Sequence, residues 1–86
     1  MTRKKTVADL RDGEEATIVD IRGPESIRTR LMEMGLVRGT RLRMLGRAPL
    51  GDPLEVKVRG TALALRRQEA RQILVTQATP QAHPSK

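Results

Sequence analysis

The residue types that perform acid-base, nucleophilic or metal chemistry are sparse in this sequence. Its 86 residues contain no cysteine and a single histidine, His83, so no second histidine or thiolate can complete a transition-metal site. Asp52 stands in a Gly-Asp-Pro sequence, which is ordinary turn chemistry and not the pattern of a metal ligand or a general base. There is no Walker-type phosphate loop and no grouping of Ser, His and Asp. We therefore expect no catalysis, no cofactor and no tightly bound metal.

Basic residues dominate the charged side chains. Seventeen Lys and Arg against ten Asp and Glu give a formal net charge of +7, which favours an anionic partner such as nucleic acid, lipid headgroups or an acidic protein. Single-strand binders commonly stack bases on aromatic rings, and this chain has no Phe, Tyr or Trp. The composition therefore argues against nucleic acid without excluding it.

Arginines are concentrated between residues 28 and 47. We predict that four of them contact a partner, together with one methionine, whose thioether repacks easily. The predicted contacts are Arg28, Arg30, Met32, Arg41 and Arg43. The alternative is a solvated surface, because the outer face of a strand must be polar in any case.

One helix is predicted over residues 24–34. Pro24 suits its start, because proline at the first helical position gives up no hydrogen bond. The residues expected on its buried face recur at helical spacing and are Ile27, Leu31 and Met34. Gly35 is placed as the left-handed residue that ends the helix, with Leu36 packed against Leu31.

Short apolar runs with alternating or β-branched residues predict about five strands. They lie near residues 16–21, 40–44, 54–58, 62–65 and 73–76. The prolines and glycine of residues 48–53 require a loop, and residues 66–71 favour a single helical turn. The periodicities predict a core of Ile18, Ile27, Leu31, Leu42, Val56, Val58, Leu63, Leu65 and Ile73.

These elements predict one small, mainly β domain. About five short strands with one inserted α-helix and a short helical turn are typical of an SH3-like β-barrel, which removes its sheet edges by curving closed. We place the domain at residues 7–76, between a flexible basic N-terminus at 1–6 and a disordered tail at 77–86. With no export signal and no membrane-spanning stretch, a cytoplasmic location is expected.

Four segments, in order, resemble patterns of the FeoA family. Residues 30–40 resemble "RL..MG(L/I)..G", and residues 48–54 resemble "(A/S)P(L/F)GDP". Residues 63–73 look like the closing pattern "(I/L)(A/S)LR..EA..I", and residues 10–13 look like the family's opening pattern "L..L..G". The residues that we single out in these matches are Leu31, Gly35, Leu36, Gly39, Pro49, Gly51, Asp52, Pro53, Leu65, Arg66, Glu69 and Ala70.

The resemblance implies an SH3-like, non-enzymatic accessory protein of bacterial ferrous iron uptake. Its implied partner is a FeoB-type GTP-dependent Fe(II) permease, which it would bind and assist or regulate from the cytoplasm, as a peripheral protein at the inner membrane. The lack of aromatic residues argues against a proline-peptide groove of the usual SH3 kind. The alternative is a basic SH3-like barrel that binds RNA, for which salt-sensitive RNA binding would be the sign. The sequence leaves open the oligomeric state and whether the permease is activated or inhibited.

Overall fold

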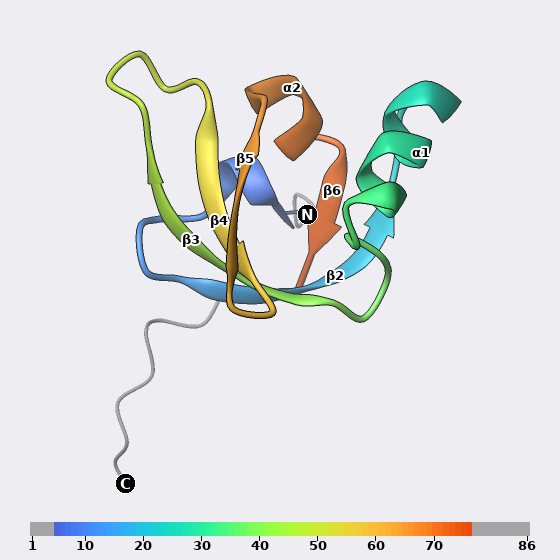
Figure 1. The fold of residues 1–86 in the computed structure, drawn as a ribbon, viewed down its shortest axis with the longest axis horizontal. Coiled ribbons are helices and arrows are strands. Elements are labelled where there is room, and N and C mark those ends of the chain that lie inside the picture. The colour runs from blue at the N-terminus through green and yellow to red at the C-terminus, as the bar shows by residue number, and fades with distance from the viewer. Residues whose placement is uncertain (1–4, 77–86) are drawn as a thin grey trace, which may run out of the picture.

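The computed structural model describes residues 5–76, which form six strands and two α-helices (Figure 1). The elements are β1 (Lys5–Thr6), the 3-10 turn η1 (Val7–Asp9), β2 (Glu15–Ile21), α1 (Glu25–Glu33), β3 (Arg41–Arg47), β4 (Leu54–Val58), β5 (Thr61–Leu65), α2 (Arg67–Ala70) and β6 (Ile73–Val75). All paired strands are antiparallel, in the order β1-β6-β2-β3-β4-β5. The predicted mainly β class, with one inserted helix and a short helical turn, is confirmed.

The long strand β2 folds the sheet on itself. Its first half, residues 15–17, pairs with β3, and its second half, residues 18–21, pairs with β6. The register shifts between Ile18 and Asp20, and a second shift interrupts the pairing of β3 with β4; irregularities of this kind bend a strand and increase its twist. The sheet therefore curves around a core that α2 closes on one side (Figure 1).

Helix α1 ends as the sequence predicts. Gly35 has a φ of +87°, and its N–H donates to the carbonyl of Met32 at 2.9 Å. The N–H of Leu36 donates to the carbonyl of Leu31 at 3.0 Å, and both leucine side chains are fully buried. This is a Schellman ending with its usual apolar contact. At the other end Pro24 is the N-cap in extended conformation, one residue before the helix that it was predicted to begin.

The interior contains aliphatic side chains and one methionine. The largest fully buried side chains are Val7, Leu10, Ile18, Leu31, Leu36, Leu42, Met44, Leu54, Val56, Leu65 and Ile73. Two predicted core residues, Ile27 and Leu63, are only partly buried and pack against the outside of this cluster. Leu63 lies on β5, which pairs on one side only, and α1 buries little besides Leu31.

The sixth strand was not predicted. Lys5 and Thr6, which the sequence assigned to the flexible N-terminus, pair with Val75 and Leu74 of β6. The carboxylate of Asp9 accepts a hydrogen bond from the Thr6 N–H at 3.0 Å and steadies the turn that follows. A two-residue strand is too short for periodicity to reveal. Residues 1–4 and the predicted tail at 77–86, with His83, lie outside the described residues.

Candidate partner-binding surfaces

The loop between β3 and β4 is fastened to helix α2. Oδ1 of Asp52 accepts a hydrogen bond from the backbone N–H of Arg67, the first residue of α2, at 3.0 Å. Within the loop the Ala48 N–H donates to the Pro53 carbonyl at 3.0 Å, and the Gly51 N–H donates to the Ala48 carbonyl at 2.7 Å. Asp52 therefore has a structural use that its turn position alone does not show: it caps a helix distant in the sequence.

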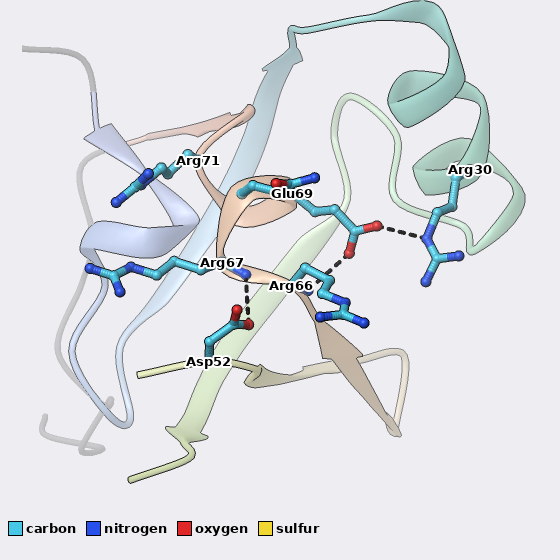
Figure 2. A pocket seen from close by; sticks show the side chains of 7 residues that line it. Arg30, Asp52, Arg66, Arg67, Glu69 and Arg71 are labelled. Atoms are coloured by element: carbon cyan, nitrogen blue, oxygen red, sulfur yellow. Dashed lines mark hydrogen bonds and ion pairs between the residues drawn. The ribbon is translucent and has the colours of Figure 1, made fainter. Parts of the chain in front are cut away.

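Glu69 connects α2 with α1. Its side chain is buried, with Oε1 accepting the Arg66 N–H at 2.9 Å and Oε2 lying 2.7 Å from Nε of Arg30 (Figure 2). Among the described residues nothing pairs with the two terminal nitrogens of Arg30, which point away from Glu69 in Figure 2. Arg30 is thus held in place by one nitrogen and presents the other two outward.

A hollow of about 530 Å³ lies where α1, α2 and the β3–β4 loop meet (Figure 2). We call it the arginine pocket, and its lining residues are Arg30, Asp52, Arg66, Arg67, Gln68, Glu69 and Arg71. Four arginines against two carboxylates leave a net charge of +2 (four minus two). In the described part of the chain, no carboxylate forms an ion pair with Arg66, Arg67 or Arg71. The pocket therefore offers guanidinium groups to an incoming anion.

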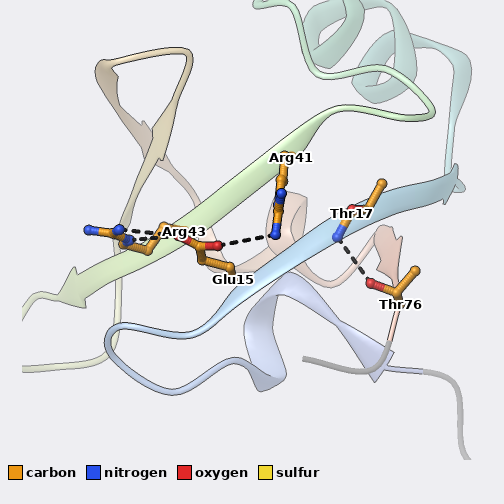
Figure 3. A network of polar contacts seen from close by, with 5 residues as sticks. All are labelled: Glu15, Thr17, Arg41, Arg43 and Thr76. Atoms are coloured by element: carbon orange, nitrogen blue, oxygen red, sulfur yellow. Dashed lines mark hydrogen bonds and ion pairs between the residues drawn. The ribbon is translucent and has the colours of Figure 1, made fainter. Parts of the chain in front are cut away.

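Arg41 and Arg43 surround Glu15 on the outer side of β2 and β3 (Figure 3). Nη2 of Arg43 lies 3.1 Å from Oε2 of Glu15, and Nη2 of Arg41 lies 3.5 Å from Oε1. Figure 3 also shows the Thr17 N–H donating to Oγ1 of Thr76 at 3.1 Å, which ties the end of the chain's last described segment to β2. One carboxylate thus partly neutralises both predicted contact arginines of this surface.

A smaller hollow runs beside α1. Its lining includes the two remaining predicted contact residues, Arg28 and Met32, together with Val37 and Arg38. The Met32 side chain is 59% exposed and Val37 is 39% exposed, so the hollow has an accessible apolar wall. Arg38 lies 3.5 Å from Asp20, which offsets its charge.

Among the described residues, Asp20 is the group whose side-chain pKa the fold clearly lowers. Its Oδ1 accepts the N–H of Ile21 at 2.9 Å, and this hydrogen bond is the main cause that lowers the pKa of the Asp20 carboxyl below 3.8. The neighbouring Arg38 and Arg22 lower the pKa further, while partial desolvation acts in the opposite direction. The Asp20 carboxyl therefore stays ionised to a lower pH than an ordinary aspartate, because its pKa is lowered.

The structure divides the predicted contacts among three surfaces. Arg28 and Met32 line the hollow beside α1, Arg30 lines the arginine pocket, and Arg41 and Arg43 lie on the sheet. Two motif segments, in contrast, come together: the loop at 48–53 and residues 65–70 meet through the hydrogen bond from Arg67 to Asp52.

Sequence reasoning did not find the arginine pocket. The sequence predicts a helical turn that contains Arg66, Arg67 and Arg71, and Arg66 also belongs to a family pattern, but no partner contact was predicted for any of the three, although three arginines lie within six residues. These arginines meet Arg30 and the β3–β4 loop only through tertiary contacts. One of these contacts is the ion pair between Arg30 of α1 and Glu69 of α2.

Residues 5–76 contain no group of three or more His, Asp or Glu side chains placed to hold a metal ion. Within the same residues no helix has the length and apolar character needed to cross a membrane.

Comparison with solved structures confirms the predicted fold. A FeoA-like protein from Clostridium acetobutylicum superposes with a TM-score of 0.82 at 32% identity, covering 100% of both chains. The FeoA protein of Stenotrophomonas maltophilia, solved in complex with zinc and described as a prokaryotic SH3 domain protein, superposes with a TM-score of 0.77 at 31% identity, covering 91% of this chain and 99% of that one. The sheet is therefore of the SH3-like kind.

A curated relative gives the same result at the level of sequence. The Fe(2+) transport protein A/Fe(2+) transporter FeoB fusion protein of Porphyromonas gingivalis is 35% identical over 69 residues, which make up 80% of this chain but 8% of that protein. The chain thus spans less than a tenth of this relative. The family model of the FeoA domain matches residues 5–77, which include every described element. The chain belongs to the FeoA domain family, which is associated with ferrous iron transport.

Proposed function

We propose that this chain is a non-enzymatic accessory protein of bacterial ferrous iron uptake that binds the cytoplasmic side of a FeoB-type permease. One observation carries the proposal: in the Porphyromonas gingivalis relative, the region similar to this chain belongs to the same polypeptide as FeoB. Fusion keeps two modules at a high effective concentration, which is useful when the modules act on each other. A domain of this family that is not fused to a permease would have to reach that proximity by binding.

The proposed mechanism is contact, without chemistry on a substrate. The predicted contact residues, Arg28, Arg30, Met32, Arg41 and Arg43, remain proposals for the binding surface. Because they lie on three separate surfaces, one substitution in each group distinguishes them. Suitable variants are Arg28→Ala, Arg30→Ala and Arg41→Ala; Arg41 is preferable to Arg43 because its side chain is 72% exposed and its loss disturbs the fold less.

The test is co-purification of the tagged chain with membranes that contain a FeoB-type permease. We expect the parent chain to be retained by these membranes and released from membranes that lack the permease, as a peripheral cytoplasmic protein would be. The surface whose variant loses retention is the contact surface. A parent chain that never co-purifies with the permease, but carries RNA that high salt removes, would replace this proposal with the RNA-binding alternative.

A further inference from the structure

Leu50 is the most exposed large apolar side chain in the described part of the protein. It is 90% exposed at the tip of the β3–β4 loop, whose ends are fixed by the hydrogen bonds of Ala48, Gly51 and Asp52 described above. Single exposed leucines are common on protein surfaces and need no explanation alone. Leu50 differs because it belongs to the same loop as Asp52, which lines the arginine pocket.

The loop tip adjoins the arginine pocket directly. A Cβ atom built on Gly51 would lie 3.7 Å from Nη1 of Arg67, so the guanidinium of Arg67 reaches the residue next to Leu50. Figure 1 shows the loop, α2 and α1 at the same end of the molecule. The loop that carries Leu50 therefore comes close to the guanidinium of Arg67, at one side of the arginine pocket.

Among the described residues, the arginine pocket contains more arginines without a carboxylate partner than either of the other two surfaces. Arg41 and Arg43 share Glu15, and Arg38 has Asp20. In the arginine pocket, by contrast, Asp52 and Glu69 accept backbone hydrogen bonds from α2, and Glu69 pairs only with Arg30. The remaining guanidiniums, of Arg66, Arg67 and Arg71, keep their donors for an external anion.

We propose that Leu50 and the arginine pocket form a docking surface for an acidic protein segment. Carboxylates of the segment enter the hollow, where guanidinium groups can bind them with paired hydrogen bonds, and an apolar residue between the carboxylates covers Leu50. Charge complementarity favours this occupant, and a concave pocket receives side chains better than it fits a flat layer of headgroups. The inference rests on the proposed function to the extent that the permease supplies the segment.

The test uses isotope-labelled full-length protein and a synthetic peptide in which one leucine stands between two pairs of glutamates. Backbone amide NMR spectra recorded during the titration should shift at Leu50, Arg67 and Arg71, and less at Glu15 and Met32. Two comparison peptides serve as controls. The peptide with serine in place of leucine should bind several-fold more weakly, and the peptide with lysines in place of glutamates should not bind measurably.

Matched variants separate the docking surface from general charge and hydrophobicity. Arg67→Glu should weaken binding by about tenfold or more, the factor that corresponds to about 1.4 kcal/mol and to the loss of a charged hydrogen bond. Arg11→Glu makes the same change of charge at an exposed residue outside the pocket and should leave binding nearly unchanged. Leu50→Ser should weaken binding, whereas Leu45→Ser, at a leucine that is 38% exposed on β3, should not.

Three results would overturn the inference. The first is an absence of amide shifts around the pocket in the parent protein, which does not depend on whether any variant folds. The second is equal weakening by Arg67→Glu and Arg11→Glu. The third is perturbation of the same amides only by vesicles of phosphatidylcholine and phosphatidylglycerol, which would make the surface a membrane contact. A parent chain that does not bind the peptide but still co-purifies with the permease would contradict this docking surface and leave the proposed function standing. A parent chain that binds the peptide but does not co-purify with the permease would contradict the proposed function and leave the docking surface standing.

Discussion

Individual side chains join the helices of this small domain to its loops and to each other. Glu69 is the buried example, with one carboxylate oxygen on the Arg66 N–H at 2.9 Å and the other on Nε of Arg30 at 2.7 Å. The two contacts differ in kind, because the first caps a helix from a sheltered position and the second ends on an arginine that is 59% exposed. Solvent weakens an ion pair of the second type far more than a capping hydrogen bond.

We therefore expect Glu69→Ala to lower the free energy of unfolding by about 1–2 kcal/mol, because the Arg66 N–H loses its acceptor. Arg30→Ala should cost less than about 1 kcal/mol, as exposed ion pairs do. Urea denaturation of the two variants measures both values. Equal losses for the two substitutions would show that the ion pair, and not the cap, is the important contact.

Gly35 has a backbone conformation and surroundings that leave little room for a side chain. Its φ is +87°, and a Cβ there would lie 2.9 Å from Nη1 of Arg59, which itself donates to the Gly35 carbonyl at 3.0 Å. Gly35→Val should destabilise the protein by about 1–2 kcal/mol or more. Gly46→Ala is the control, since no atom lies within 4 Å of the added Cβ and φ is not positive. If Gly35→Val melts like the parent while Gly46→Ala does not, the capping argument is wrong.

The ionisation of Asp20 makes the free energy of unfolding depend on pH in the acidic range. Its pKa is lowered in the folded protein, chiefly by the Ile21 N–H, so the folded state binds a proton less readily than the unfolded chain does. The stabilisation is therefore complete above the ordinary value of 3.8 and is lost as the pH falls through the lower folded pKa. Asp20→Asn should flatten this part of the pH profile. Urea denaturation of parent and variant at a series of acidic pH values tests it, and parallel profiles would contradict it.

At the level of elements, sequence patterns predicted the strands and helix ends that are stabilised by residues close together in the sequence. The alternation of Leu54, Val56 and Val58 defines a strand, and the Gly35-Leu36 ending defines the end of a helix, because each depends on neighbours in sequence. β1 was missed because two residues carry no period, and it exists only through pairing with β6. The arginine pocket was missed for the same reason, since its parts meet only after α2 is placed against α1 and the β3–β4 loop.

Burial within β5 gives a test of this distinction. Leu63 and Leu65 have the same sequence pattern, yet Leu65 is fully buried and Leu63 only partly. Leu65→Ala should cost about 2–5 kcal/mol, as buried leucines do, which approaches the whole stability of a domain this small. Leu63→Ala should cost clearly less, because fewer packing contacts are lost. Denaturation curves that rank the two variants in the opposite order would contradict the assignment of the core.

Seen as a whole, the molecule combines a small rigid sheet with a strongly basic surface. Its core stabilises one compact SH3-like unit, and the full sequence has a formal net charge of +7. The described residues present three basic surfaces that differ in how many of their arginines have a carboxylate partner. Charge of this kind speeds the encounter with an acidic partner and gives it direction. The arrangement suits the proposed role in binding, and the fusion of a similar domain to FeoB in a relative is the observation on which the proposed partner rests.

The most direct measurement is therefore co-purification of the tagged full-length chain with membranes that do or do not contain a FeoB-type permease. Three proteins should be compared in parallel: the parent, Arg67→Glu, and Arg11→Glu as the charge-matched control. The account predicts that parent and control are retained only by membranes with the permease, and that Arg67→Glu is retained less. Equal recovery of the parent from both kinds of membrane, or from neither, would contradict the central claim that this domain binds the permease.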